Sequence, residues 1–243
     1  LPRHGRGHKI PPTEINYRAN IEALKRAGVD RIVSFSAVGS LREDYKPGDF
    51  VIVDQYVDRT FAREKSFFGT GFVAHVSMAD PVCTTTSEVI TKSAKSITLN
   101  VHTSGTYLVM EGPQFSSRAE SNWYRSIGCD VIGMTNMPEA KLAREAEIAY
   151  ATVAMVTDYD CWHQDHDDVN TASILEVLQN NSEHAKELIK ALVPRLGALQ
   201  APFESGAHTS LEHAIATVPE QRDPELSAKL AVITKRVIDN PGW

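Results

Sequence analysis

The chain has 243 residues, which is enough to bury the core of one α/β domain. Its formal net charge of -6 at pH 7 excludes a broad electrostatic attraction to nucleic acid or to an anionic membrane, so we expect a small molecule as its ligand. Three cysteines without CxxC spacing, and no apolar stretch of the roughly 18 residues that a membrane span needs, favour a cytoplasmic protein without disulfides, bound metal or membrane contact.

The first predicted element is a helix over residues 13–27. Thr13 can cap it, apolar residues then recur at helical spacing, and Gly28 follows its end. Short apolar segments that are rich in β-branched and aromatic residues predict strands further along the chain. These strands span 31–38, 50–57, 97–102, 107–110, 131–134 and 151–157.

Two further predicted helices, 117–127 and 138–149, separate the later strands. Several of the strands are apolar throughout, which is typical of strands that helices cover on both faces. We therefore predict an α/β fold with a central mixed, largely parallel sheet flanked by helices.

Beyond Val169 the sequence predicts helices. Residues 171–192 carry an apolar stripe that Pro194 ends, and Asp223 with Pro224 opens a last amphipathic segment. We predict a main domain at 1–195 and a helical C-terminal extension at 196–243, which we expect to dock or pair and not to catalyse.

The first motif that can carry chemistry is RHGRGH, at residues 3–8. Arginine supplies a fork of N–H donors suited to phosphate, and glycine lets the backbone approach an anion. A solvated basic terminus explains the same residues, so the motif alone leaves both interpretations open.

Small residues occupy 36–41, where the first predicted strand ends. Such residues at the carboxyl end of a strand leave backbone N–H groups free to hold phosphate. An ordinary strand-to-loop turn has the same composition and remains the alternative.

A helix start is predicted after Phe115, because Ser117 and Glu120 have the spacing of a capping box. Phe115 then lies in a loop at the end of a strand, where its ring can stack on a flat base. The alternative is that Phe115 is an ordinary core residue and Ser116 part of the cap.

The most informative motif is TDYD, at residues 157–160 after the last predicted strand. Asp158 and Asp160 are costly to hold at the end of a buried strand unless they have partners, which favours a functional role over simple turn capping. Residues 133–139 follow another strand, and Pro138 there can open a helix, so they form a second ligand-facing edge.

Together these motifs resemble the 5′-methylthioadenosine phosphorylase branch of the trimeric purine-nucleoside phosphorylases. The similarity covers approximately residues 3–162 and weakens afterwards. It runs in order through RHGR, NYRANIEALK, GSLRED, PGDFVIVDQYVDRT, EGPQFSSRAES, GMTNMPEAKLAREAEI and ATVAMVTDYDCW.

The resemblance implies a phosphate site made of arginine, histidine and small residues. Its members here are Arg3, His4, Ser36, Ala37 and Thr135. We expect the carboxyl edges of separate strands to meet, so that the TDYD turn holds the base opposite this anion site.

The resemblance also implies the contacts of the nucleoside. Phe115 stacks on the purine, Met134 packs beneath the ribose, and Asp158 and Asp160 face the base. His75 resembles a residue that reaches across a subunit boundary towards the 5′ end of the sugar, which implies a homotrimer. We further expect Thr171 and Ile174 to line an apolar 5′ pocket.

The implied reaction is phosphorolysis of 5′-methylthioadenosine to adenine and 5-methylthioribose 1-phosphate, without a metal or an organic cofactor. Breaking the N-glycosidic bond leaves positive charge on the sugar and negative charge on the purine, so both must be stabilised. Phosphate beside carbon 1′ does the first, and a protonated Asp158 at purine N7 does the second as a general acid. Asp160 would accept a hydrogen bond from the exocyclic amino group.

Two alternatives stay open. One is a broader purine-nucleoside phosphorylase, although the related 6-oxopurine enzymes have Asn in place of Asp158 and Glu in place of Ser116, so these residues favour a 6-amino purine. The other is an inactive oligomeric binding subunit, because family members begin with a strand and a Gly-rich phosphate loop that would precede Leu1.

Overall fold

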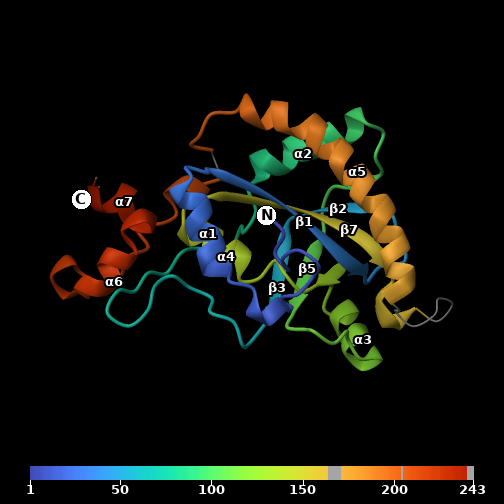
Figure 1. The fold of residues 1–243 in the computed structure, drawn as a ribbon, viewed down its shortest axis with the longest axis horizontal. Coiled ribbons are helices and arrows are strands. Elements are labelled where there is room, and N and C mark those ends of the chain that lie inside the picture. Colours follow the sequence, from blue (N-terminus) through green and yellow to red (C-terminus); the bar gives the residue numbers. More distant parts are fainter. Residues whose placement is uncertain (164–170, 204, 240–243) are drawn as a thin grey trace.

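The structure is a computed structural model that describes residues 1–163, 171–203 and 205–239, without the side chains of residues 171–175 and 239. At its centre lies a seven-stranded sheet with the order β3-β5-β6-β1-β7-β2-β4 (Figure 1). Four neighbouring pairs of strands are parallel, and the pairs β1–β6 and β2–β7 are antiparallel, which confirms the predicted mixed, largely parallel sheet. The strands are β1 (Arg31–Ser40), β2 (Phe50–Val53), β3 (Gln55–Arg59), β4 (Val101–His102), β5 (Thr106–Met110), β6 (Val131–Gly133) and β7 (Ala149–Asp158).

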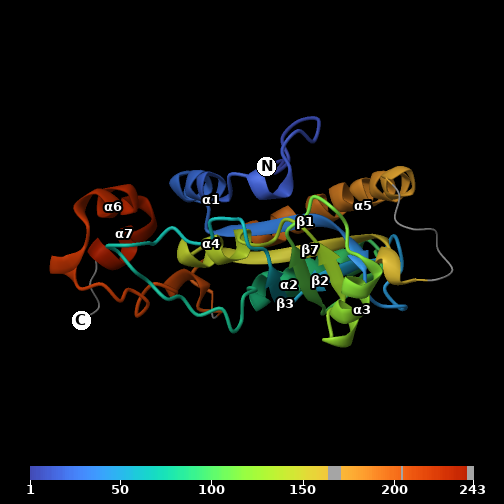
Figure 2. The same cartoon turned by 90° about the horizontal axis from the view of Figure 1, so that it is seen from below.

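Helices cover both faces of the sheet, as the apolar strands predicted (Figures 1 and 2). Because successive side chains of a strand point to opposite faces, Val153 of β7 joins the cluster that packs under α2 and α5, and Ala154 joins the core on the face of α1 and α4. No described helix is both long and apolar enough to cross a membrane. The helices are α1 (Tyr17–Arg26), α2 (Thr84–Ser96), α3 (Arg118–Ser126), α4 (Glu139–Glu145), α5 (Thr171–Gly197), α6 (Pro224–Lys229) and α7 (Ala231–Asp239).

The start of the first helix differs from the prediction. Asn16 caps α1, since its side chain accepts a hydrogen bond from the Ala19 backbone N–H. Thr13 lies in a short 3-10 helix and donates instead to the carboxylate of Glu111. The predicted cap is wrong because threonine and asparagine both suit this position. The Thr13 hydroxyl forms its hydrogen bond with the distant Glu111 instead.

The predicted strand 50–57 is two strands, β2 and β3, with Asp54 between them. Asp54 exchanges hydrogen bonds with the backbone of Gly105, which turns the chain out of β2. One residue can span only a few ångströms, so the sheet must curl until β3 at one edge approaches β2 near the other.

The predicted strand 97–102 is largely wrong. Ile97 is the C-cap of α2, Thr98 has a φ of 58°, and only Val101–His102 pairs as β4. Helix α2 itself was not predicted, because its sequence TTTSEVITKSAKS is rich in residues of weak helix propensity. Its packing against α5 and the sheet stabilises it.

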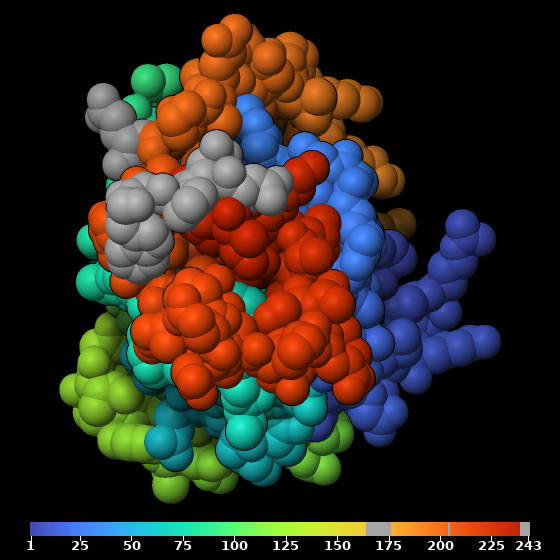
Figure 3. Space-filling model, turned by 90° about the vertical axis from the view of Figure 1, so that its left-hand side faces the viewer, coloured from blue at the N-terminus to red at the C-terminus, as the bar shows by residue number. Residues whose placement is uncertain are grey.

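The C-terminal helices differ from the prediction in two places. Helix α5 continues through Pro194 to Gly197, and the last helical segment is broken at Leu230 into α6 and α7, although Asp223 caps it as predicted. Residues 207–239 cover one end of the molecule (Figure 3), where Leu230 enters the core that also contains α1. The division into domains near residue 195 stays a prediction.

Candidate active site

One cavity of about 820 Å³ gathers most of the predicted site residues. It is lined by the N-terminal segment, by β1, and by the ends of β5, β6 and β7. Nine of the twelve residues that sequence reasoning singled out lie on its wall: Arg3, His4, Ser36, Ala37, Phe115, Met134, Thr135, Asp158 and Asp160. The predicted phosphate and base residues therefore face a common space.

The cavity does not lie at a shared carboxyl edge, contrary to our expectation. Strand β6 runs antiparallel to β1, with Gly39 opposite Ile132, so its carboxyl end passes beside the middle of β1. There the Ser36 hydroxyl lies 3.2 Å from that of Thr135. Residues 36–40 are also not a turn, because β1 continues through a bulge at Val38/Gly39 to Ser40. The cavity thus follows the seam between antiparallel strands.

The TDYD motif, residues 157–160, forms an acid turn at one end of the cavity. Strand β7 ends at Asp158, whose Oδ1 accepts a hydrogen bond from the Asp160 backbone N–H at 2.8 Å. Its Oδ2 lies 2.7 Å from the Thr157 hydroxyl. Burial raises the pKa of Asp158, although these two hydrogen bonds oppose the shift.

Asp160 is also buried, and one of its two carboxyl oxygens lacks a hydrogen bond to any described residue. Its φ of 50° is uncommon for a residue with a side chain, and its Oδ2 has no hydrogen-bond partner within the described chain. Burial raises the pKa of Asp160, and the neighbouring Asp158 carboxyl raises it further. Both acids therefore bind a proton more readily than an exposed carboxylate does.

Gly39 makes room for the acid turn. A Cβ atom there would lie 3.0 Å from Oδ1 of Asp158 and 3.3 Å from Cβ of Asp160. Both contacts are tighter than ordinary van der Waals packing, so any larger residue at this position would displace the carboxyls.

The opposite end of the cavity is basic. The Arg3 guanidinium, whose side chain is only 12% exposed, donates to the Phe35 carbonyl at 2.8 Å, to Glu139 at 3.2 Å and to Asn136 at 3.4 Å. Because arginine stays protonated, this buried group is a permanent cation on the cavity wall.

His4 lies beside Arg3 on the same wall. Its Nδ1 is 2.8 Å from the Ile10 carbonyl, and since a carbonyl only accepts, Nδ1 carries a proton. Its ring stacks on His8, which also lines the cavity. Burial lowers the pKa of His4, with His8 and Arg3 adding to the effect.

Buried hydroxyls complete this end. The Ser36 hydroxyl lies 3.1 Å from that of Tyr107 as well as 3.2 Å from that of Thr135. Gly133 leaves the space for Tyr107, because a Cβ there would overlap the phenol oxygen. A cation, an imidazole and two hydroxyls are the groups that bind phosphate in proteins.

The remaining wall is apolar. Phe115 is 53% exposed and lines the cavity, so its ring is free to stack on a ligand. It precedes α3, whose predicted capping box between Ser117 and Glu120 is confirmed. Met134 lies on the same cavity wall, and its sulfur packs against Gly112, where a Cβ would come within 2.5 Å.

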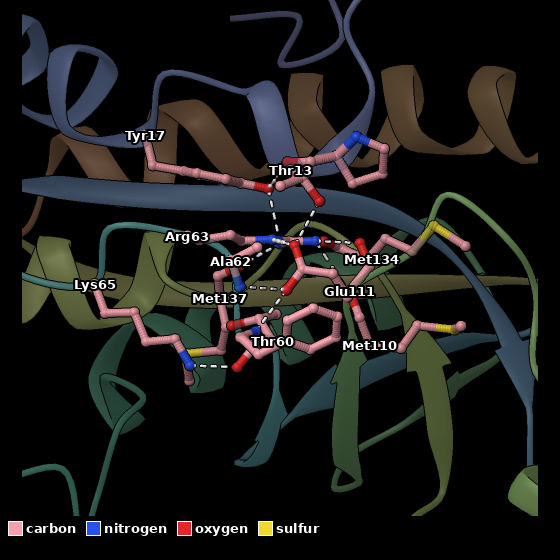
Figure 4. Close-up of polar contacts among 12 residues, drawn as sticks. Thr13, Tyr17, Thr60, Ala62, Arg63, Lys65, Met110, Glu111, Met134 and Met137 are labelled. Atoms are coloured by element: carbon pink, nitrogen blue, oxygen red, sulfur yellow. Dashed lines mark hydrogen bonds and ion pairs between the residues drawn. The ribbon is translucent and has the colours of Figure 1, made fainter.

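A buried ion pair beside the cavity holds this wall in place, and sequence reasoning missed it (Figure 4). Arg63, with 1% of its side chain exposed, donates to the Glu111 carboxylate at 3.0 Å and to the Met134 and Met137 carbonyls, each at 2.6 Å. Glu111 directly follows β5, so a charged residue after a buried strand was the available signal. Arg63 lies in a loop without any pattern that marks it.

Of the other three predicted residues, only His75 has a side chain that the structure describes. His75 is exposed and outside the cavity, and its backbone N–H bonds to the Ala214 carbonyl, so its predicted role needs a second subunit and stays a prediction. The side chains of Thr171 and Ile174 lie outside the described residues. Leu178, farther along α5, does line the cavity. Within the ranges described, no group of three or more ligating side chains could hold a metal ion.

Known proteins are similar to this chain in sequence and in fold. Residues 1–194 match the model of the phosphorylase superfamily. An S-methyl-5'-thioadenosine phosphorylase of Rhodospirillum rubrum is 58% identical over 98% of this chain and 81% of its own length, and one of Gloeobacter violaceus is 50% identical over 96% and 79%.

Solved structures of methylthioadenosine phosphorylases are also similar to this chain. A methylthioadenosine phosphorylase from an antarctic soil metagenomic library is 49% identical, with a TM-score of 0.91 over 96% of this chain and 82% of its own. A methylthioadenosine phosphorylase from Schistosoma mansoni in complex with adenine is 37% identical, with a TM-score of 0.82 over 86% and 80%. The matched family model, the identities and the shared fold together show that this chain belongs to the phosphorylase superfamily.

Proposed function

We propose that the chain cleaves 5′-methylthioadenosine with inorganic phosphate, giving adenine and 5-methylthioribose 1-phosphate. The observation that carries the proposal is that the acids Asp158 and Asp160 share one cavity with Arg3, Ser36 and Thr135. The relatives named above support the choice of nucleoside, since they are phosphorylases of this compound.

The burial of Asp158 favours its role as the acid. The Thr157 hydroxyl has a single proton but lies near two acceptors, the Val38 carbonyl at 3.1 Å and Asp158 Oδ2 at 2.7 Å. Because that proton is shared between the two acceptors, Thr157 compensates the buried carboxylate of Asp158 only in part. Burial raises the pKa of Asp158, which favours protonation of its carboxyl and donation of that proton to purine N7 as the glycosidic bond breaks. Asp160 would accept from the 6-amino group.

Phosphate would bind at the basic end. Arg3, Ser36 and Thr135 supply donors, and a bound dianion favours the protonated form of His4, whose second N–H can then donate as well. One phosphate oxygen bonds to carbon 1′ while the bond from carbon 1′ to N9 breaks. The proton that monohydrogen phosphate loses on forming the ester replaces the one that Asp158 gives to adenine.

The remaining parts of the proposal concern the surroundings of the site. Phosphate is a co-substrate, and no metal or organic cofactor is required by this chemistry. Phe115 stacks on the base, Met134 lies under the ribose, Ala37 contacts phosphate, and the 5′-methylthio group meets an apolar pocket to which Thr171 and Ile174 contribute. A homotrimer in the cytoplasm is the proposed state, in which His75 reaches the site of a neighbouring subunit.

A turnover assay tests the proposal. The protein is incubated with inorganic phosphate and either 5′-methylthioadenosine or inosine, and adenine and hypoxanthine are separated by chromatography. We expect phosphate-dependent release of adenine and little hypoxanthine, because a 6-oxo group facing Asp158 and Asp160 leaves buried polar groups unpaired at about 1–3 kcal/mol each. Dominant hypoxanthine release would indicate a broader nucleoside phosphorylase, and no release from either would refute phosphorolysis.

A further inference from the structure

We propose that Glu139 positions the Arg3 guanidinium for phosphate, an inference that rests on the function proposed above. Glu139 is the first residue of α4 and does not line the cavity itself. It acts through Arg3, which does.

The Glu139 carboxylate is held from two sides. Its Oε1 accepts a hydrogen bond from the Tyr150 hydroxyl at 2.6 Å and another from Arg3 at 3.2 Å. Tyr150 is fully buried within the core, and burial raises its pKa far above the ordinary range, so it stays protonated and donates at any working pH. The carboxylate is therefore fixed in place before any ligand arrives.

The contacts of Arg3 show how this fixes its guanidinium. Its acceptors come from three places in the fold: Phe35 in β1, Asn136 after β6 and Glu139 in α4. Acceptors in three directions fix the plane of a guanidinium as well as its position. Of the five N–H groups, these three bonds leave two without an acceptor in the described part of the protein, and they are available to an anion in the cavity.

The last residue of the same helix separates positioning from burial. Glu145 is also buried, but it bonds to the Ser66 hydroxyl and the Phe67 backbone N–H and does not line the cavity. Two buried glutamates thus begin and end α4, and only Glu139 contacts a group on the cavity wall. Removing either costs stability, whereas only the loss of Glu139 should change how phosphate binds.

The experiment compares Glu139→Ala, Glu139→Gln and the matched control Glu145→Ala. For each protein, KM is measured separately for phosphate and for 5′-methylthioadenosine, with thermal unfolding as the record of folding. We expect Glu139→Ala to raise KM for phosphate roughly tenfold or more, because a misplaced donor loses its alignment with the anion, while KM for the nucleoside changes less than about twofold. Glu139→Gln should recover most of the loss, since its amide oxygen can accept the same two hydrogen bonds.

Glu145→Ala should lower the unfolding temperature without changing the ratio of the two KM values. The inference is overturned if folded Glu139→Ala keeps the parental KM for phosphate, or if both KM values rise together. Should Glu139→Ala fail to fold, Glu139→Asp decides: its carboxylate is withdrawn by one methylene, so an unchanged KM for phosphate would refute positioning.

Calorimetric titration with inorganic phosphate gives a measurement that does not depend on turnover. Weaker phosphate binding in Glu139→Ala than in the parent supports the inference, and equal binding contradicts it. If the parent binds phosphate but releases no adenine, the proposed function fails while the positioning of Arg3 is still decided by this titration.

Discussion

Two regions beside one another bury carboxylates in opposite ways. Glu111, in the ion-pair region around Arg63, accepts hydrogen bonds from Thr13 and Arg63 on one oxygen and from the backbone N–H groups of Phe61 and Ala62 on the other. Although burial opposes the charge, these hydrogen bonds lower the pKa of Glu111 to about 2. In the acid turn, burial raises the pKa of Asp158 and Asp160, because their hydrogen bonds do not compensate for it.

Burial of a charged residue therefore does not by itself indicate function. A carboxylate whose oxygens are all occupied by protein donors is a structural anchor, since it has no capacity left for a ligand. A buried carboxyl with an unpartnered oxygen, such as Asp160, carries a free-energy cost that a ligand can remove. Substitutions in the two regions should distinguish a carboxylate that anchors the structure from a carboxyl that binds a ligand.

Asp158→Asn should have the largest effect on activity. An amide cannot give up a proton to purine N7, so we expect kcat/KM for 5′-methylthioadenosine to fall by about 10²–10⁴. The free energy of unfolding should change little, because Asn keeps the shape of the carboxyl without placing a charge in a buried position. The measurement is steady-state kinetics beside urea unfolding, and a variant as active as the parent would remove Asp158 from the acid role.

Arg63→Met should have the largest effect on stability. It leaves the Glu111 carboxylate buried without its cation, which costs about 3–5 kcal/mol. Urea unfolding measures the loss. As a control, Lys65→Met removes a half-exposed cation that lies 3.2 Å from Asp58, and should cost about 1 kcal/mol or less. Equal losses from both variants would show that the buried pair is not an anchor.

The two regions should also respond to pH with opposite sign. The pKa of Glu111 is lowered by folding, so its contribution to stability is present above its ordinary value of 4.5 and is lost as pH falls towards 2. The pKa of Asp158 is raised by folding, so its contribution is present below its ordinary value of 3.8 and is lost as pH rises through the folded value.

Urea unfolding between about pH 3 and pH 8 tests both slopes. Glu111→Gln should flatten the decline on the acid side, and Asp158→Asn should flatten the decline on the alkaline side. Curves that run parallel to that of the parent would mean that neither carboxyl titrates differently in the folded protein.

Thr13→Val should have the smallest effect. It removes one hydrogen bond to Glu111 while the other three donors remain, so we expect a loss of about 1 kcal/mol in the free energy of unfolding. Thermal unfolding measures the loss, and KM for phosphate serves as the control because Thr13 does not line the cavity. A loss as large as that of Arg63→Met would show that Glu111 depends on every donor equally.

Local features of the sequence were sufficient to predict much of the sheet and the acid turn. The apolar run of β7 forms a strand that ends at Asp158, and the spacing of Ser117 and Glu120 makes a capping box. Each of these patterns depends only on nearby residues. Similarity to a known family added Arg3 and Thr135 to the predicted site, which composition and spacing alone would have left undecided.

The way in which these elements come together depends on contacts between distant parts of the chain. The antiparallel pairing of β1 with β6 places Thr135 against Ser36, where a common carboxyl edge had been expected. Arg63 and Glu111, 48 positions apart, form their ion pair because the path of the chain brings two loops together. Helix and strand periodicity and helix caps are determined by residues that are near in sequence. Strand direction and the pairing of buried charges depend on the packing of the whole chain.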